Sequence, residues 1–132
     1  YQQILIIKSL IIKSSLNIKI ITCPIIRDFD DLALSSRNKL LSEKERKIAP
    51  IIFKTLLDVK NNFKSGKIDK LKRNIYNNFK SIPLLKLEYL EIRENITLKP
   101  IKKINKKNKY RAFIAVIVGK IRLIDNIELS LI

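Results

Sequence analysis

Residues 23–50 read CPIIRDFDDLALSSRNKLLSEKERKIAP and change character halfway. The first part, 25–38, has little regular pattern and ends in the polar group SSRN at 35–38. Ser42 and Glu45 then have the Ser-x-x-Glu spacing of a capping box, in which the two side chains satisfy backbone N–H groups at the start of a helix. The stretch therefore predicts a polar loop that leads directly into a helix.

The residues after the capping box predict two helices. Pro50 interrupts the first, and it should kink that helix or confine its first turn to a separate piece. We expect 64–67, with Gly66, to end the first helix and a second helix to cover 67–80 until Pro83. The apolar positions at helical spacing are Ile48, Ile52, Leu56 and Val59 in the first helix and Ile68, Leu71, Ile75 and Phe79 in the second.

Beyond Pro83 the pattern alternates as in strands. Residues 85–94, LKLEYLEIRE, predict a strand with one phase slip near Tyr89, which we interpret as a bulge. The sequence then predicts a short extended piece at 95–100 and a charged turn at 104–109. Two strands follow within 110–129, on either side of Gly119 and Lys120. Two helices followed by a small antiparallel sheet form an α+β arrangement.

The residues before the loop have α/β character. Residues 1–16 predict an apolar helix that is buried on most sides, and 18–23, IKIITC, predict a short strand of the buried parallel type. Cys23 is accordingly interpreted as a small buried hydrophobe and not as a nucleophile. A single strand has no partner for its backbone, so we expect this part to be the last piece of a larger sheet domain.

The net charge is +16, from 28 Lys and Arg against 12 Asp and Glu. Such a charge is typical of proteins that bind nucleic acid or anionic membranes. Here it is mostly Lys spread over the whole chain, and Arg, the preferred base reader, is sparse. Lys, Ile and Asn all have A/T-rich codons, so codon bias is the favoured explanation and no specific nucleic acid is expected.

The numbers of cysteines and histidines restrict the kinds of site that this chain can form. The single cysteine excludes an internal disulfide, as expected in the cytoplasm, and the absence of histidine excludes His-based catalysis and His metal ligands. We expect no metal-binding residues. Lys8 and Lys13 interrupt the apolar N-terminal run before the ~20 residues that a membrane span needs. The chain starts at Tyr1 and not at Met, so we expect it to be a fragment or a processed product of a longer protein.

The SSRN group at 35–38 suits an anion. Hydroxyl and backbone donors can surround phosphate oxygens, and Arg37 can add a charge-assisted bond. The alternative is a polar loop whose serines make local turn bonds. Composition alone favours this alternative.

Four segments decide the question together. They are YQQ at 1–3, the quoted stretch at 23–50, YLEIRENITLKP at 89–100 and RLIDNIEL at 122–129. In this order they resemble the pantoate–β-alanine ligase (pantothenate synthetase) family. That family shows Tyr-Gln-Gln, then Pro-x-x-Arg-x-x-Asp-Gly-Leu-Ala-x-Ser-Ser-Arg-Asn, Leu-Ser-x-x-x-Arg and Arg-Leu-Ile-Asp-Asn.

The resemblance implies a cytoplasmic, homodimeric ligase that joins pantoate to β-alanine through a pantoyl-adenylate, releasing pyrophosphate and AMP. The partners would be pantoate, β-alanine and ATP with Mg²⁺, the latter as substrate, with no tightly bound cofactor. By the same resemblance, residues 1–33 would be the end of a Rossmann-type ATP- and pantoate-binding domain. Residues 34–132 would be the small C-terminal lid and dimer-associated domain.

The family's functional residues carry over to a few positions. Gln3 would bind pantoate, and Ser36 and Arg37 would be catalytic. The ATP-binding residues would be Ile26, Leu34, Ser35, Ser36 and Arg37. Asn38 would shape the loop, and Arg122, Asp125 and Asn126 would close the small sheet through hydrogen bonds. Read without the resemblance, Ile26 is a buried apolar residue.

Two departures from the family lead to further expectations. Asp31 stands where the family has Gly, which matters if the backbone needs a positive φ there. The family's His-x-Gly-His and Gly-x-Lys-Asp segments would precede Tyr1, so this chain alone should have little or no ligase activity. The alternatives are a basic module that binds nucleic acid non-specifically and a decayed remnant. The best basic patch for the first, KKINKKNK at 102–109, is better interpreted as a solvated turn.

Overall fold

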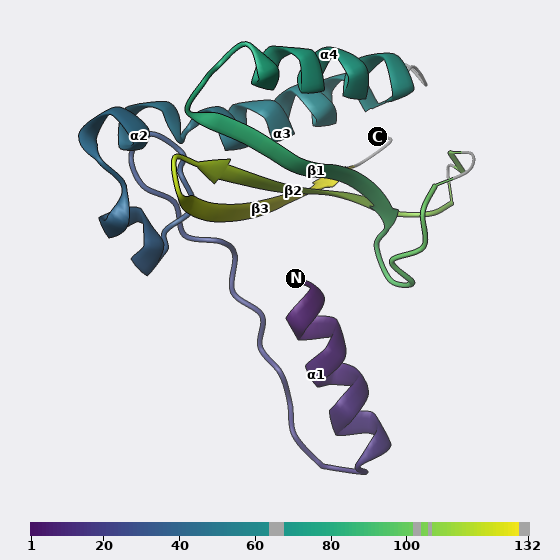
Figure 1. Cartoon of the computed structure of the whole chain (residues 1–132). Helices are drawn as coiled ribbons and strands as arrows, with labels where there is room; N and C mark the ends of the chain where they lie inside the picture. Colours follow the sequence, from purple (N-terminus) through teal and green to yellow (C-terminus); the bar gives the residue numbers. More distant parts are fainter. Residues whose placement is uncertain (64–67, 102–103, 106, 130–132) are drawn as a thin grey trace.

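The computed structural model describes residues 1–63, 68–101, 104–105 and 107–129. Helices α3 and α4 lie together over one face of a three-stranded sheet, and α1 projects from the opposite side at the end of a long extended segment (Figure 1). The helices are α1 (Gln2–Lys13), η1 (Ser36–Leu40), α2 (Glu43–Ile48), α3 (Ile51–Asn62) and α4 (Ile68–Lys80), and the strands are β1 (Leu85–Glu94), β2 (Tyr110–Val118) and β3 (Ile121–Leu129).

The sheet is an antiparallel meander in the order β1-β2-β3. The expected irregularity is confirmed, because the pairing of β1 with β2 shifts between Leu87 and Tyr89. The hairpin turn between β2 and β3 is also confirmed. Gly119 has a φ of 61° there, and its N–H donates to the Leu84 carbonyl at 2.8 Å.

The start of the first predicted helix is confirmed. The Ser42 hydroxyl accepts from the Glu45 N–H, and the Glu45 carboxylate accepts from the Ser42 N–H at 2.7 Å, which completes the capping box of α2. Pro50 is the N-cap of α3, so the first turn is indeed a separate helix. The expected helix end at 64–67 lies outside the described residues, as does part of the 102–109 run.

The core forms between the helices and the sheet. Helix α3 packs on β2 and β3, and α4 packs on β1. The large side chains that are fully buried come from α3, its C-cap residue and all three strands: Ile52, Leu56, Val59, Phe63, Leu90, Ile114, Val116, Val118 and Leu129. The second predicted helix is confirmed by α4, in which Ile75 and Phe79 are buried.

The prediction of an extended piece at 95–100 is wrong. The Leu98 N–H donates back to the Glu94 carbonyl at 3.0 Å, and Leu98 has a φ of 55°. The Thr97 hydroxyl binds the Glu94 carboxylate. These local bonds fold the segment into a turn, and of it only Pro100 forms a bridge, with Arg93.

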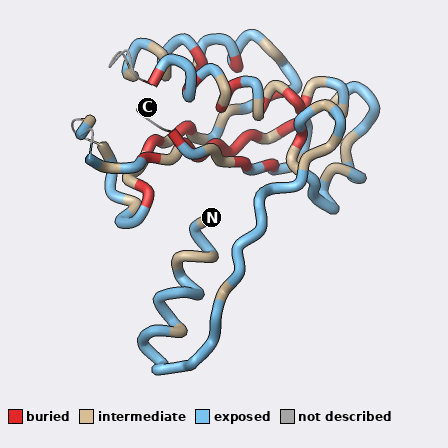
Figure 2. Tube along the Cα trace, turned by 180° about the vertical axis from the view of Figure 1, so that it is seen from behind, coloured by how far each residue is buried: buried red, intermediate tan, exposed pale blue. Residues whose placement is uncertain are grey.

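The prediction that the N-terminal helix, strand and Cys23 are buried is wrong. Helix α1 has no buried residue, as the tube of Figure 2 shows. The segment after it forms no strand, and Cys23 is exposed. Ile12 and Ile21 are 78% and 80% exposed, because no described element covers them. None of the helices in the described ranges has the length and apolarity that a membrane crossing requires.

Tyr1 is the point at which α1 contacts the sheet. Its hydroxyl donates to the Asn95 carbonyl at 2.9 Å, and the Arg111 guanidinium lies 3.9 Å from its ring centre. The ring also lies 6.3 Å from that of Phe113. The first turn of α1 is therefore held on the sheet face that α3 and α4 leave open.

Candidate nucleotide loop and its two cavities

The loop at 27–38 folds back on itself. Its backbone closes through Asp28 N–H to the Leu32 carbonyl at 2.8 Å, Asp31 N–H to the Asp28 carbonyl at 3.0 Å, and Leu34 N–H to the Ile26 carbonyl at 3.0 Å. Asp31 has a φ of 69°, as expected for a position where the family has Gly. Leu32 is buried, whereas Ile26 is 69% exposed, so its interpretation as a buried residue is wrong. The Ile26 carbonyl is bonded to the loop, but no described element covers the Ile26 side chain.

Arg27 ties the base of this loop to the sheet. Its two terminal nitrogens donate to the two carboxylate oxygens of Asp125 at 2.7 and 3.1 Å. One of them also donates to the Asp31 carbonyl at 3.1 Å, and the guanidinium lies 3.7 Å from the ring centre of Phe53 in α3. The Asp125 side chain is only 3% exposed. A carboxylate so buried depends on its partner, because an unpaired buried charge is strongly destabilising.

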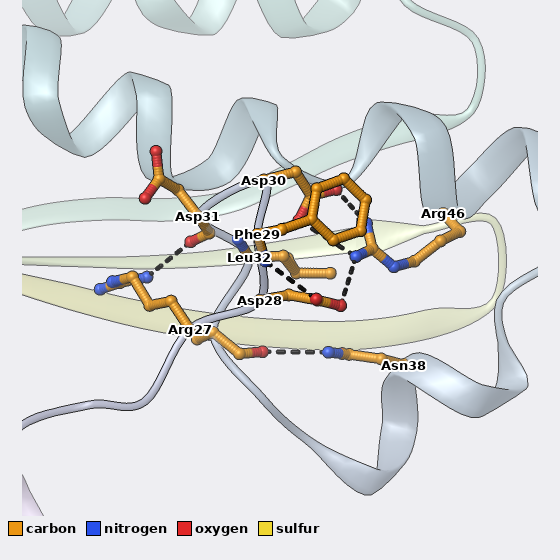
Figure 3. A network of polar contacts seen from close by, with 9 residues as sticks. Arg27, Asp28, Phe29, Asp30, Asp31, Leu32, Asn38 and Arg46 are labelled. Carbon is orange, nitrogen blue, oxygen red and sulfur yellow. Dashed lines mark hydrogen bonds and ion pairs between the residues drawn. The ribbon is translucent and has the colours of Figure 1, made fainter.

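Arg46 of α2 holds the turn of the loop. Its guanidinium lies 2.7 Å from a carboxylate oxygen of Asp28 and 2.5 Å from one of Asp30. Figure 3 shows Arg46 pointing toward both carboxylates. The hydrogen bonds from Arg46 hold the pKa of the Asp30 carboxyl below its ordinary value, and the pair raises the pKa of Arg46. The capping box therefore fixes the start of a helix that also anchors the preceding loop.

The end of the loop is shaped by its own polar residues. The Ser35 hydroxyl accepts from the Arg37 N–H at 3.2 Å as the N-cap of η1, which confirms the local turn bond. The Asn38 amide donates to the Ala33 carbonyl at 3.0 Å, consistent with its expected shaping role. In the described part of the chain, the side chains of Ser36 and Arg37 are exposed and make no hydrogen bond or ion pair. These donors are therefore available to a ligand.

Two adjoining cavities lie beside the loop. One, of about 230 Å³, lies between the loop and β3, and Leu34, Ser35 and Arg37 line it. The other, of about 280 Å³, is lined by Gln3, together with Tyr1, Tyr89 and Asn126 among others. Both cavities share Ala33, Ile124 and Asp125. The structure therefore brings Gln3 to the same region as the serine loop, although 32 to 34 positions of sequence separate them.

The three residues expected to close the sheet do so only in part. Arg122 donates to Glu88 at 2.5 Å, and Asn126 accepts from Arg111 at 2.7 Å. Asp125 instead binds Arg27 and so holds the loop. No cluster of three or more acidic or Cys side chains suited to a metal occurs among the residues that the structure describes.

The sequence reasoning missed the roles of Arg27, Asp125 and Arg46. A signal was present in β3, where Leu123, Asp125 and Ile127 share one side of the strand by alternation. A carboxylate between two core positions requires a charged partner. Nothing in the local pattern says that this partner is Arg27.

Comparison with known proteins agrees with this geometry. The Pantoate-beta-alanine ligase family model matches residues 1–128. Pantothenate synthetase of Flavobacterium psychrophilum is 41% identical over 130 residues, which are 98% of this chain and 46% of the relative. That of Clostridium acetobutylicum is 40% identical over 132 residues, with 95% of this chain and 44% of the relative covered.

Solved structures show the same likeness. The crystal structure of pantothenate synthetase from Thermus thermophilus superposes with a TM-score of 0.85 at 30% identity, over 98% of this chain and 47% of that one. Francisella tularensis pantoate-beta-alanine ligase, complexed with beta-gamma ATP and beta-alanine, gives a TM-score of 0.63 at 33% identity, over 97% and 40% of the two chains. The chain thus spans about half the length of the relatives it matches. On these matches, the chain belongs to the pantoate–β-alanine ligase family.

Proposed function

We propose that this chain provides the ATP-facing loop and the small C-terminal domain of a ligase that condenses pantoate with β-alanine. The observation that carries the proposal is that Gln3 lines one cavity, whereas Leu34, Ser35 and Arg37 line the adjoining one, with the exposed Ser36 between the last two in sequence. Gln3 would hydrogen-bond pantoate on one side. Ile26, Leu34, Ser35, Ser36 and Arg37 would bind ATP on the other.

The free donors of the loop suit the first chemical step. A pantoate carboxylate oxygen attacks the α-phosphorus of ATP·Mg²⁺, and the bond to pyrophosphate breaks, which gives pantoyl-adenylate. Negative charge grows on the phosphate oxygens and on the leaving group, and fixed donors aimed there lower the barrier. Ser36 and Arg37 are exposed donors of this kind, and Arg37 is the one that can make a charge-assisted, bidentate bond.

The second step uses the adenylate that the first step makes. The amine of β-alanine attacks the acyl carbon, AMP leaves, and the amine loses a proton as the amide of pantothenate forms. All three substrates carry carboxylate or phosphate groups. Of these, ATP and pantoate are net anions, and the net charge of +16 would attract these two and raise their local concentration.

The exposed apolar surface supports a division of the chain into two parts. Residues 1–33 would belong to a Rossmann-type domain, whose remaining elements would cover α1 and the apolar segment after it. Ile6, Ile12 and Ile21 are 68%, 78% and 80% exposed, which is unusual for side chains of this type. Residues 34–132 would be the lid of a cytoplasmic homodimer, inactive without the rest of the site.

A chimera tests this function. The region of the Flavobacterium psychrophilum enzyme that matches this chain would be replaced by residues 1–132. We expect pantoate-dependent release of pyrophosphate from ATP, and pantothenate when β-alanine is added. The control is the same enzyme with the matching region deleted. A folded chimera without pantoate-dependent pyrophosphate release would contradict the proposal and favour a decayed remnant.

A further inference from the structure

The position of the serine loop is set by long-range contacts. The backbone bonds of 27–38 close a turn but do not attach it to the sheet, and Ser35, Ser36 and Arg37 are all exposed. Packing of these three side chains therefore contributes little to their placement. A loop that must present donors to within a fraction of an ångström needs support from elsewhere.

Arg27 provides this support from a well-packed site. Its side chain is 16% exposed, and its guanidinium joins three elements by binding Asp125 in β3, resting on Phe53 in α3 and donating to the carbonyl at the far end of the turn. Asp125 is held in turn by the N–H of Asn126 at 2.7 Å. Both partners of the ion pair are thus fixed by the folded sheet.

Arg27 is not itself positioned as an anion ligand. Both terminal nitrogens already donate to the Asp125 carboxylate, and one face of the guanidinium is covered by Phe53. A phosphate would have to displace a buried carboxylate to reach it. Any effect of Arg27 on phosphate chemistry must therefore pass through the loop.

We propose that Arg27 is a positioning residue which, through its ion pair with Asp125, holds the loop that carries Ser35, Ser36 and Arg37 against the cavity between the loop and β3. The pair lies at the base of the loop, and Asp125 lines that cavity together with Ser35 and Arg37. The two residues therefore form one unit. This inference rests on the proposed function, which assigns the loop to ATP.

The test uses the chimera described above. Arg27→Gln and Asp125→Asn each break the pair, and the double variant removes both charges. Arg93→Gln is the matched control, because Arg93 also pairs with a carboxylate of the sheet, Glu91 at 3.5 Å, but lies outside the cavity beside the loop. Circular dichroism at each temperature of measurement establishes that the molecules are folded.

At saturating substrates, we expect either single variant to lower the rate of adenylate formation by about 100-fold, the loss typical of catalytic groups displaced by about 1 Å. The double variant should lose no more than about 3-fold beyond the single ones, since the two residues act as a unit. Arg93→Gln should retain the rate. Single variants within about 3-fold of the unmodified chimera, or losses that multiply in the double variant, would overturn the inference.

Amide hydrogen exchange gives a second readout that needs no activity. Arg27→Gln should speed exchange of the backbone N–H of Leu34, which closes the loop by donating to the Ile26 carbonyl, and of Asn38, which donates to the Ser35 carbonyl within η1. The backbone N–H groups of β2 should exchange at an unchanged rate. Unchanged exchange at these two amides would also overturn the inference. If the unmodified chimera were inactive, the proposed function would fail, and the exchange data would still decide whether Arg27 positions the loop.

Discussion

The guanidinium of Arg46 lies 2.5 Å from a carboxylate oxygen of Asp30, across the turn that precedes the serine pair. Helix α2 therefore fixes not only its own first turn but also the loop before it. Both side chains are about three-quarters buried, at 25% and 24% exposure, so the pair is partly shielded from salt.

The stability that this pair contributes should be lost at acid pH. The Arg46 hydrogen bond lowers the pKa of Asp30 below its ordinary value of 3.8. A group whose pKa is lower in the folded state stabilises the fold above its unfolded pKa, and this contribution is lost as the pH falls through the folded value. We therefore expect Asp30→Asn to destabilise the chain at pH 6, and this effect to shrink progressively as the pH falls below 3.8, measured by urea unfolding.

A matched control for this prediction is Asp69→Asn. Asp69 is an exposed carboxylate in the first turn of α4, remote from the loop in sequence. It should not reproduce the pH dependence of the Asp30 variant. An Asp30→Asn effect that stayed constant from pH 6 to pH 2 would show that the ion pair does not carry the stability.

Ser36→Ala tests the catalytic donor. In the chimera, we expect the rate of adenylate formation to fall by about 10²–10³-fold, the loss seen when one donor to a developing oxyanion is removed. Ser35→Ala is the comparison variant, because the Ser35 hydroxyl already accepts the Arg37 N–H as the N-cap of η1. Adenylate formation in the Ser36 variant within a few-fold of the unmodified chimera would contradict the role.

Two variants of Asp31 distinguish the effect of its charge from the effect of its backbone conformation. Its φ of 69° suits Gly, and its exposed carboxylate belongs to the turn of the loop whose other end is proposed to bind ATP. We expect Asp31→Asn and Asp31→Gly to lower the KM for ATP to a similar extent, by about 2–5-fold, because both remove one exposed negative charge. The two variants should differ in stability by less than about 1 kcal/mol, since the relief of strain by Gly is offset by its unfolded-state entropy.

The comparison of these two variants is decisive. A lower KM for ATP in the Gly variant alone would show that backbone conformation, and not charge, is what the Asp changes. Initial rates over a range of ATP concentrations give the KM, and urea unfolding gives the stability difference.

Position 119 requires glycine for two reasons: the backbone has a positive φ there, and a Cβ atom would collide with Glu45. A Cβ built there would lie 1.6 Å from Oε1 of Glu45, and the φ is +61°. We expect Gly119→Ala to destabilise the chain by at least about 1–2 kcal/mol through the positive φ and, in addition, to displace the capping-box carboxylate. In a Glu45→Ala background the second effect should vanish, so a cost of Gly119→Ala that is the same in both backgrounds would exclude the contact.

The local features of the fold could be predicted from the sequence. The capping box at Ser42, the helix break at Pro50, the irregularity near Tyr89 and the hairpin at Gly119 each depend on residues within a few positions of one another. Propensity and spacing suffice for such features. The free donors at Ser36 and Arg37 could also be inferred, because the resemblance identifies the loop.

Burial of the N-terminal part could not be predicted in the same way. The apolar runs around Ile12 and Ile21 predict a buried helix and strand, but burial requires a partner, and the described part of the chain provides none. Cys23 is exposed for the same reason. The Arg27–Asp125 pair was missed because it joins residues that local pattern cannot connect.

The separation between Arg27 and Asp125 has a consequence for the order of folding. The two residues are 98 positions apart, whereas the meander from β1 to β3 forms between strands adjacent in sequence. Contacts over such a distance carry a larger loop-closure entropy and form after the local ones. The serine loop would therefore reach its final position only when β3 is in place. A chain that stops short of Asp125 could build most of α2 to β2 and pair Arg46 with the carboxylates of the loop. The base of the loop would still lack its anchor on β3, so the candidate site is completed last.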